Sequence, residues 1–376
     1  MPSYSGVWTL PAQMQAEAAG TWPKPPVELW SWGSNNGGQL GLGNTTYYSS
    51  PKQIGAVSAW ATTDAGYSFV TAIKRDGTLW AWGSNSQAQL GIGNTISKSS
   101  PVQVGALTTW SKVSSGYAHT LAIKTDGTLW SWGFNNLGQL GLGNTAYFSS
   151  PKQIGALTTW SAIAAVDRNS AAVKTDGTLW MWGRNNFGQL GLGNTTNYSS
   201  PVQVGALTTW LSVFGGNYFT LATKTNGTLW AWGRNTYGRL GLGNTTNYSS
   251  PKQVGALTTW ATMSGGNNHT LATKTDGTLW SWGRNNNGQL GVSNTTNYSS
   301  PIQVGALATW LSVTAGTYDS SIAVKTEGTL WGWGNNPQGV LGRGNKTDYS
   351  SPVQLGALTS WTSAQTGHTF TVAIKA

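Results

Sequence analysis

The chain contains no cysteine, which excludes a disulfide framework, thiolate metal sites and thiol nucleophiles. Charged residues are scarce, at 9% of 376 residues, against about a quarter in an average soluble domain. No apolar run approaches the roughly 18 residues of a membrane-spanning helix. The N-terminus has neither the basic start nor the apolar core of a secretory signal. Basic residues still outnumber acidic ones, 21 to 11, which by itself would favour an anionic partner such as nucleic acid.

Tryptophan and glycine are abundant, with 23 and 51 residues. A Leu-Trp-x-Trp-Gly pattern recurs seven times with a period of 50 residues, broken once by an insertion between Thr317 and Ser321. The Trp pairs are Trp30/Trp32, Trp80/Trp82, Trp130/Trp132, Trp180/Trp182, Trp230/Trp232, Trp280/Trp282 and Trp331/Trp333, and a third series is Trp60, Trp110, Trp160, Trp210, Trp260, Trp310 and Trp361. Trp at fixed positions of predicted strands indicates core packing. The repeat predicts an arm over 1–26 and a repeat domain over 27–376.

Each unit predicts four short strands and no helix. In the unit 116–165, alternating residues over 120–124 enter Thr125-Asp126-Gly127, which predicts a two-residue hairpin turn with φ > 0 at both positions. Strands follow over 128–132, 151–154 and 160–163, with a Gly-rich loop before Pro151. Four strands repeated seven times are typical of an all-β, seven-bladed β-propeller with four-stranded blades. An open solenoid would need atypical terminal repeats.

The ends of the repeat domain predict how the ring closes. The final strand, 367–375, is the one that elsewhere leads into the Asp-Gly turn, and 27–32 is the one that elsewhere follows it. We therefore expect the C-terminal strand to pair antiparallel with Leu29–Trp32, the first strand after the N-terminal arm.

The repeat resembles the regulator of chromosome condensation repeat family. The resemblance rests on Trp132-Gly-Phe-Asn-Asn-Leu-Gly-Gln-Leu-Gly-Leu-Gly143 and Gly116-Tyr-Ala-His-Thr-Leu-Ala-Ile-Lys124, which recur with variations in all seven units. It implies a seven-bladed propeller that binds proteins through its faces. Members include a nucleotide exchange factor for a nuclear GTPase, a plant UV-B photoreceptor and a bacterial inhibitor of β-lactamase. The photoreceptor needs tryptophans where this chain has Tyr67, Tyr117, Asn217 and Asn267, so that activity does not transfer.

The titratable residues do not form a catalytic pattern, and we expect no enzyme activity, no cofactor and no metal. Five acids stand in predicted hairpin tips, where turn chemistry accounts for them: Asp76, Asp126, Asp176, Asp276 and Glu327. His119 and His269 occupy the family's Gly-x-x-His position and are interpreted as structural. Seven lysines share one position beside these tips: Lys74, Lys124, Lys174, Lys224, Lys274, Lys325 and Lys375. We interpret them as a solvated collar rather than an anion-binding rim, which makes nucleic acid a poor candidate partner.

Specificity is expected where the units differ from one another. Three consecutive units carry Arg after Trp-Gly, and one unit places Asp167-Arg168 where the others have small or amide residues. The predicted contact residues are Arg168, Arg184, Phe187, Arg234, Tyr237, Arg239 and Arg284. Drift after duplication is the alternative explanation.

The arm, 1–26, has signals for one short helix, with Thr9 as a cap, Pro11 early and Gly20 as a stop. Its Gly6-Val-Trp8-Thr-Leu10-Pro-Ala-Gln13 segment and Gly20-Thr-Trp22-Pro23 resemble the opening of structural proteins of tailed, especially marine, bacteriophages. The resemblance implies an attachment peptide, with Trp8, Leu10, Met14 and Trp22 as anchor residues. Alternatively, the arm folds back onto the propeller.

The sequence therefore predicts a non-enzymatic bacteriophage virion surface protein, such as a capsid decoration, fibre or tail-associated recognition head. Other virion proteins would bind its arm, and a host surface ligand would bind a propeller face. The alternative is a cytoplasmic protein-interaction propeller or an exchange factor-like regulator.

Overall fold

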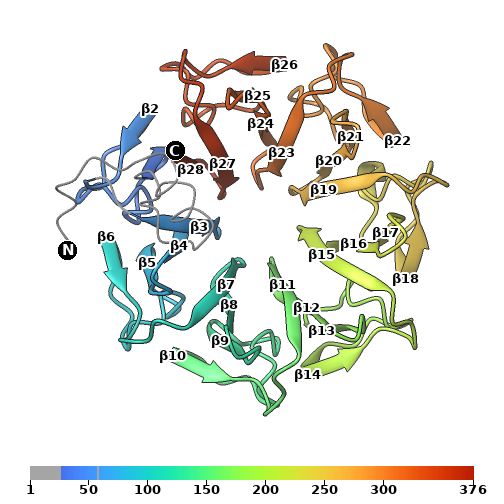
Figure 1. The fold of residues 1–376 in the computed structure, drawn as a ribbon. Helices are drawn as coiled ribbons and strands as arrows, with labels where there is room; N and C mark the ends of the chain where they lie inside the picture. Colours follow the sequence, from blue (N-terminus) through green and yellow to red (C-terminus); the bar gives the residue numbers. More distant parts are fainter. Residues whose placement is uncertain (1–26, 57–58) are drawn as a thin grey trace, which may run out of the picture.

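The computed structural model describes residues 27–56 and 59–376, which form seven four-stranded antiparallel sheets arranged as the blades of a closed ring (Figure 1). The all-β seven-bladed propeller expected from the repeat is confirmed. The predicted arm and its anchor residues Trp8, Leu10, Met14 and Trp22 lie outside the described residues.

Each blade has the same order of strands from the centre outward (Figure 1). The innermost strands are β3 (Trp60–Ala65), β7 (Trp110–Ser115), β11 (Trp160–Val166), β15 (Trp210–Gly216), β19 (Trp260–Gly265), β23 (Trp310–Ala315) and β27 (Trp361–Thr366). The second strands are β4 (Phe69–Lys74), β8 (His119–Lys124), β12 (Asn169–Lys174), β16 (Phe219–Lys224), β20 (His269–Lys274), β24 (Ser320–Lys325) and β28 (Phe370–Lys375).

The two outer strands complete each blade. The third strands are β1 (Glu28–Gly33), β5 (Leu79–Gly83), β9 (Leu129–Gly133), β13 (Leu179–Gly183), β17 (Leu229–Gly233), β21 (Leu279–Gly283) and β25 (Leu330–Gly334). The outermost strands are β2 (Tyr48–Gln53), β6 (Lys98–Gln103), β10 (Phe148–Gln153), β14 (Tyr198–Gln203), β18 (Tyr248–Gln253), β22 (Tyr298–Gln303) and β26 (Tyr349–Gln354). A short 3-10 turn, η1 (Thr236–Gly238), follows β17. The sequence unit is therefore offset from the blade. The third Trp series, Trp60, Trp110 and their equivalents, begins the innermost strand of the next blade.

The ring closes through the predicted strand pair. Strand β28 pairs antiparallel with β1, with Glu28 opposite Lys375 and Gly33 opposite Phe370. The closing blade has the order β2-β1-β28-β27, so each end of the repeat domain supplies two strands. Lys375 Nζ forms an ion pair with Glu28 Oε2 at 2.8 Å across the broken hairpin tip.

The second Trp of each pair fixes one blade to the next. All seven of these side chains are fully buried. Trp132 Nε1 donates to the main-chain oxygen of Gln89 in the preceding blade at 3.0 Å, and Thr120 Oγ1 donates to the same oxygen. Gly91 passes so close that a Cβ there would lie 2.5 Å from the Trp132 nitrogen. The repeated Trp and Gly are thus two halves of one inter-blade contact, and core packing by tryptophan is confirmed.

The hairpin tips differ from the predicted two-residue turn. Only Gly127 has positive φ, at 77°, and Asp126 does not. Gly127 N donates to Lys124 O, and Lys124 N donates to Thr128 O, which defines a three-residue loop with a glycine bulge. The Asp126 carboxylate accepts bonds from Thr128 N and Thr128 Oγ1, and these bonds lower its pKa. The acids of the tips are therefore turn residues, as interpreted.

The lysine collar is not the freely solvated one that the sequence suggested. Lys124 Nζ lies 3.7 Å from the ring centroid of Trp130 and 5.2 Å from that of Trp110. The same arrangement recurs in five other blades at 3.6 to 4.1 Å. Cation–π attraction holds each ammonium against tryptophan, so the lysines are part of the blade structure.

Candidate functional site

The turns between the innermost and second strands lie beside the loops that follow the third strands, on one face of the ring. Arg184 N donates to Arg168 O at 3.0 Å, Arg234 N to Tyr218 O at 2.9 Å, and Arg284 N to Asn268 O at 2.9 Å. We call this the mouth face, made of turns such as 166–168 and loops such as 184–187. The hairpin tips lie on the opposite face.

Four arginines of the mouth face lie on aromatic rings from neighbouring turns and loops. The Arg168 guanidinium lies 4.8 Å from the Tyr117 ring centroid, and that of Arg184 lies 4.5 Å from Tyr218. The Arg234 guanidinium lies 5.0 Å from the ring of Phe187. We call Arg168, Arg184, Arg234 and Arg284 the arginine row. Stacking holds each guanidinium plane in place while its edge can still donate hydrogen bonds.

Two members of the row also have acidic partners. Arg284 forms an ion pair with Asp319 at 3.0 Å, and Arg184 lies 3.8 Å from an oxygen of Asp167. Burial raises the pKa of Asp167 to about 6, with Arg184 acting in the opposite direction. Among the described residues, Arg168 and Arg234 form no ion pair within 4.0 Å, so the row keeps a net positive charge.

Backbone strain is concentrated beside the row. Six non-glycine residues of the described chain have positive φ, and four of them lie on the mouth face: Asp167 at 44°, Tyr218 at 70°, Tyr237 at 69° and Asp319 at 59°. Non-glycine residues in this region cost free energy and tend to occur at functional sites. Here they direct the rings and carboxylates toward the arginines.

The two predicted aromatic contacts both take part in this arrangement. Phe187 packs edge-on against Tyr218, with centroids 5.4 Å apart. Tyr237 is 39% exposed, with the Arg284 guanidinium 5.6 Å from its ring. The structure thus brings six of the seven predicted contact residues together, while whether they bind a partner stays a prediction.

Arg239 does not belong to the exposed row. It is fully buried, and its Nη1 donates to Asn267 O at 2.7 Å and Asn217 O at 3.3 Å. Arg239 stands where five other loops have Gln and one has Val340. The Gln side chain bonds its own loop, as Gln189 does with Phe187 N. Desolvation lowers the pKa of Arg239 to about 9, which leaves it charged at neutral pH. Its predicted role as a direct contact is therefore wrong. Its buried side chain instead holds the turns of Asn217 and Asn267 in position.

Sequence reasoning missed an aromatic group that continues around the mouth from Tyr117, the ring that holds Arg168. His368 stacks on Tyr67 with centroids 4.1 Å apart, Tyr117 lies 4.7 Å from Tyr67, and Tyr318 lies 4.9 Å from His368. Burial lowers the pKa of His368 to about 4, so its ring is neutral at physiological pH. The only signal in the sequence was that Tyr67, Tyr117 and His368 share one turn position in successive units, with Tyr318 in the inserted segment of the unit before His368.

The two buried histidines have the structural role that was expected. His119 and His269 are fully buried, with Nε2 3.0 Å from Ser170 Oγ and Ser321 Oγ of the next blades. Desolvation lowers the pKa of each to about 3. Within the described ranges, no group of three His, Asp or Glu side chains could hold a metal ion. No helix in the described part of the chain is long and apolar enough to cross a membrane.

Val27 lies on the face opposite the mouth. Val27 forms a parallel bridge with Ala59, next to the hairpin tips, and β1 then runs across the blade to the mouth face, where Ser34 N bonds Thr369 O. Six loops of this opposite face expose a leucine, each about half accessible to solvent: Leu107, Leu157, Leu207, Leu257, Leu307 and Leu358. An attachment through residue 27 therefore leaves the arginine row on the far side.

Comparison with known proteins identifies related domains. Residues 27–318 match the RCC1-like domain, and residues 327–374 match the regulator of chromosome condensation (RCC1) repeat. No curated protein sequence matches the chain significantly.

Solved structures reproduce the fold at low sequence identity. A structure of Kap60 bound to yeast RCC1 (Prp20) gives a TM-score of 0.84 at 18% identity, covering 93% of this chain and 89% of the other. Human WBSCR16 gives 0.83 at 20% identity, covering 93% and 99%. Prp20p from Saccharomyces cerevisiae, described with its binding to Gsp1p and histones, gives 0.83 at 18% identity, covering 93% and 91%.

Proposed function

The chain belongs to the family of RCC1-like domains, and from that premise we propose that it is a non-enzymatic binding protein whose partner contacts the mouth face. The arginine row carries this proposal. Its guanidinium groups are half-buried and fixed by aromatic rings before any partner arrives. Arg and Tyr are enriched among the residues that dominate binding energy, and side chains that are already ordered lose less entropy on association.

The charge of the row indicates the chemistry of the partner. Four guanidinium groups face two carboxylates, Asp167 and Asp319, in the described structure. A partner surface with carboxylates or other planar anionic groups would complete the hydrogen bonding of Arg168 and Arg234. The local acids and histidines support a binding role over catalysis, since the acids already pair with arginine and the histidines are buried.

The proposed setting is the surface of a tailed bacteriophage particle, as a capsid decoration, fibre or tail-associated head. Two features support it: the resemblance of the arm to phage structural proteins, and the entry of the chain on the face opposite the arginine row. An arm bound to other virion proteins would present the row outward, toward a ligand on the host surface.

Host binding is tested with purified, fluorescently labelled protein and cells of the host bacterium. We expect saturable binding by the native chain and at least a tenfold loss for the triple variant R184A/R234A/R284A. The matched control is K52A/K152A/K252A, which removes three exposed positive charges from outermost strands and should bind normally. Equal losses in the two triple variants would reduce the effect to net charge and contradict the proposal.

Virion placement is tested separately with the arm. The native chain should co-purify with particles through a density gradient, and a chain lacking residues 1–26 should not. Absence of the native chain from washed particles would contradict the virion setting while leaving mouth-face binding open to the first experiment.

The second candidate function is that of an exchange factor-like regulator inside the cell. The similarity to yeast RCC1 favours this function, but at 18% identity that similarity concerns the fold alone. Release of labelled GDP from the nuclear GTPase on which the family's exchange factor acts would support this alternative. No acceleration by a stoichiometric amount of the chain would count against it.

A further inference from the structure

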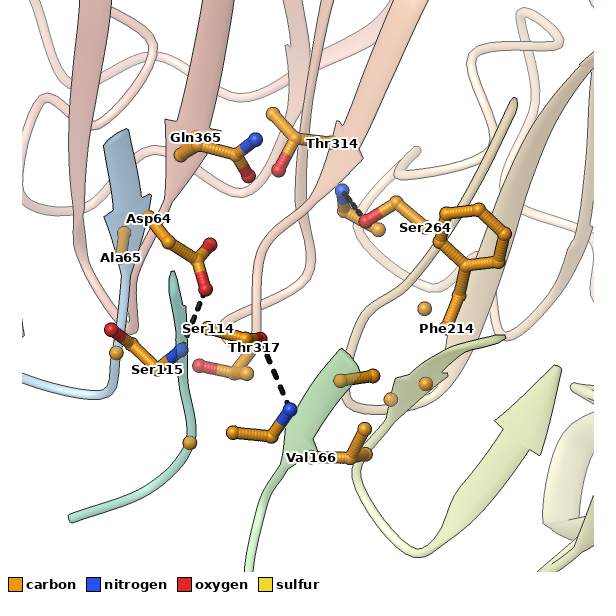
Figure 2. A pocket seen from close by; sticks show the side chains of 18 of the residues that line it. Asp64, Ala65, Ser114, Ser115, Val166, Phe214, Ser264, Thr314, Thr317 and Gln365 are labelled. Carbon is orange, nitrogen blue, oxygen red and sulfur yellow. Dashed lines mark hydrogen bonds between the residues drawn. The ribbon is translucent and has the colours of Figure 1, made fainter. Parts of the chain in front are cut away.

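The seven innermost strands surround a central channel of about 730 Å³ (Figure 2). Each innermost strand begins with a Trp, and the fourth residue after this Trp lines the channel. These residues, which we call the channel ring, are Asp64, Ser114, Ala164, Phe214, Ser264, Thr314 and Gln365. No two neighbouring strands share the same residue here, although the outer strands of the blades are almost identical.

Small hydroxyl residues of the ring join one innermost strand to the next. Ser114 Oγ accepts a hydrogen bond from Ala165 N at 3.0 Å, and Ser264 Oγ accepts one from Ala315 N at 3.0 Å. Thr314 Oγ1 accepts one from Thr366 N at 3.3 Å. A neutral hydroxyl is therefore sufficient for the structural task of this position.

Asp64 performs the same task with a charged group. Its Oδ2 accepts a hydrogen bond from Ser115 N at 2.6 Å (Figure 2). Desolvation raises the pKa of Asp64 to about 6, and no cation contributes to this shift. No lysine lines the described channel, and its one arginine, Arg168, belongs to the mouth. The Ser114 hydroxyl also bonds the Asp64 carboxylate. Serine would make the Ser115 contact without the cost of burying a charge, so joining the two strands does not require a carboxylate.

Gln365, the neighbour of Asp64 in the channel ring, is also larger than the small hydroxyl residue that suffices to join two strands. Strands β27 and β3 are adjacent, and the Gln365 amide extends into the channel near Asp64 and Thr314 (Figure 2). In the described structure this amide has no hydrogen-bond partner in the protein. Asp64 and Gln365 thus place a carboxylate and a free amide at equivalent positions of adjacent strands.

The opposite side of the channel is apolar. Phe214 comes from β15, across the ring from β3 (Figure 1), and its ring makes no inter-strand hydrogen bond. Val166 from β11 also lines the cavity (Figure 2). An alanine suffices at the equivalent position of the neighbouring strand, Ala164, so the phenyl ring is likewise not required to join the blades.

We propose that the channel binds a small organic ammonium ion, with its charged end held by Asp64 and Gln365 and its apolar end against Phe214 and Val166. An ammonium group donates three hydrogen bonds, which the carboxylate and the amide oxygen can accept. The cavity volume falls within the usual range for ligand pockets, about 300–1,000 Å³. Asp64, Phe214 and Gln365 come from the innermost strands and not from the arginine row, although mouth turns also line the cavity, and binding here requires no protein partner.

The test uses 4-phenylbutylammonium as the probe and 4-phenylbutanol as its neutral counterpart, with calorimetry at pH 8, where Asp64 is ionised. The native protein should bind the ammonium at least tenfold more tightly than the alcohol. D64N keeps an acceptor for Ser115 N and should remove this preference. F214A should weaken both compounds, and D126N, in a hairpin tip, should change neither.

Folding and surface effects are separated by two further variants. D64S introduces the hydroxyl that Ser114 supplies in the next strand, so it should fold normally and lose the ammonium preference. R184A/R234A/R284A should bind the probe as the native protein does, whatever its effect on a protein partner. Equal affinity for the two compounds, unchanged ammonium affinity in D64N, or no binding at millimolar concentration would overturn the proposal.

Discussion

The outer strands of the blades and the innermost strands follow opposite rules. In the outer strands, Leu-Trp-x-Trp-Gly recurs in every unit because the second Trp of each pair bonds a carbonyl of the preceding blade. The first Trp bonds its own hairpin tip, as Trp130 does with Thr128 Oγ1. In the innermost strands, one unit reads Thr62-Thr-Asp-Ala65 and another Ser212-Val-Phe-Gly215. Side chains that face the channel have open space on one side, and a single small hydroxyl is enough to join neighbouring strands, as Ser114 does with Ala165 N. Repetition therefore marks where folding constrains the sequence, and variation marks where a partner or ligand can act.

One position of the innermost strands is an instructive exception. Gly216 faces the ring of Phe219, and a Cβ there would come within 2.3 Å of it; Gly116 faces His119 in the same way. The unit with Asn169 in place of the ring has Val166 in place of the glycine. The valine fills the space that the missing ring would leave. Even the variable strand is thus constrained where it meets the second strand.

The largest expected effect breaks the repeated half of this comparison. W132A removes a fully buried indole and its bond to Gln89 O, which should cost about 3–5 kcal/mol of unfolding free energy. S114A, in the innermost strand of the same blade, should cost less than about 1 kcal/mol. Urea unfolding followed by circular dichroism measures both. Similar costs for the two variants would show that the two regions are not distinct.

A second effect concerns the histidines that replace phenylalanine in two blades. Their pKa of about 3 in the folded state lies below the value of about 6.5 in an unfolded chain. The unfolded state therefore binds protons first, and stability falls as the pH drops from about 6.5 toward 3. At pH 5 the loss is about 2 kcal/mol for each histidine. H119F/H269F, which restores the Phe69 and Phe219 pattern, should flatten this decline in unfolding free energy between pH 7 and 5.

A smaller effect of opposite sign comes from the channel. The folded-state pKa of Asp64 is raised to about 6, so its favourable contribution is present below about pH 4 and is lost as the pH rises through 6. D64N should therefore stabilise the protein at pH 8 by about 1 kcal/mol, since Asp64 is only partly buried, and should have little effect at pH 4. Thermal unfolding at the two pH values checks the sign. Destabilisation at pH 8 would mean that the carboxylate has a structural role.

The smallest stability effect is expected in the arginine row. R234A removes a half-buried guanidinium with no ion pair in the described structure, so it should change the unfolding free energy by less than about 1 kcal/mol. R239A leaves two turn carbonyls without their buried donor and should cost more, about 1–3 kcal/mol. Comparable effects of the two substitutions would remove the distinction between a contact residue and a positioning residue.

The sequence predicted the parts of the molecule that depend on repetition. Seven blades, four strands in each and the β1–β28 closure follow from the spacing of Trp, Gly and Pro. The offset between the sequence unit and the blade could not be predicted, because a 50-residue repeat can be divided into units at any position. The turn at Asp126 was predicted to have two residues but has three, since the Asp-Gly pair also occurs in hairpins with a glycine bulge.

The functional surfaces were only partly predictable, because they depend on contacts between units. The arginines were recognised as departures from the repeat, but the burial of Arg239 depends on the carbonyls of Asn217 and Asn267. The rings of Tyr117 and Tyr218, which hold the row, come from neighbouring turns. The facing of Asp64 and Phe214 across the channel results from ring closure, and no spacing along the chain signals it.

The closing blade has a mechanical consequence. Glu28 and Lys375 lie opposite each other at the same end of the β1–β28 pair. Tension between these two residues would therefore break the hydrogen bonds of the pair one after another, starting from that end. A tether at Val27 alone applies no such load, because a force on the mouth face is then carried through the blades. A propeller held from one end of its chain can therefore bear a pull that would unravel it if both ends were fastened.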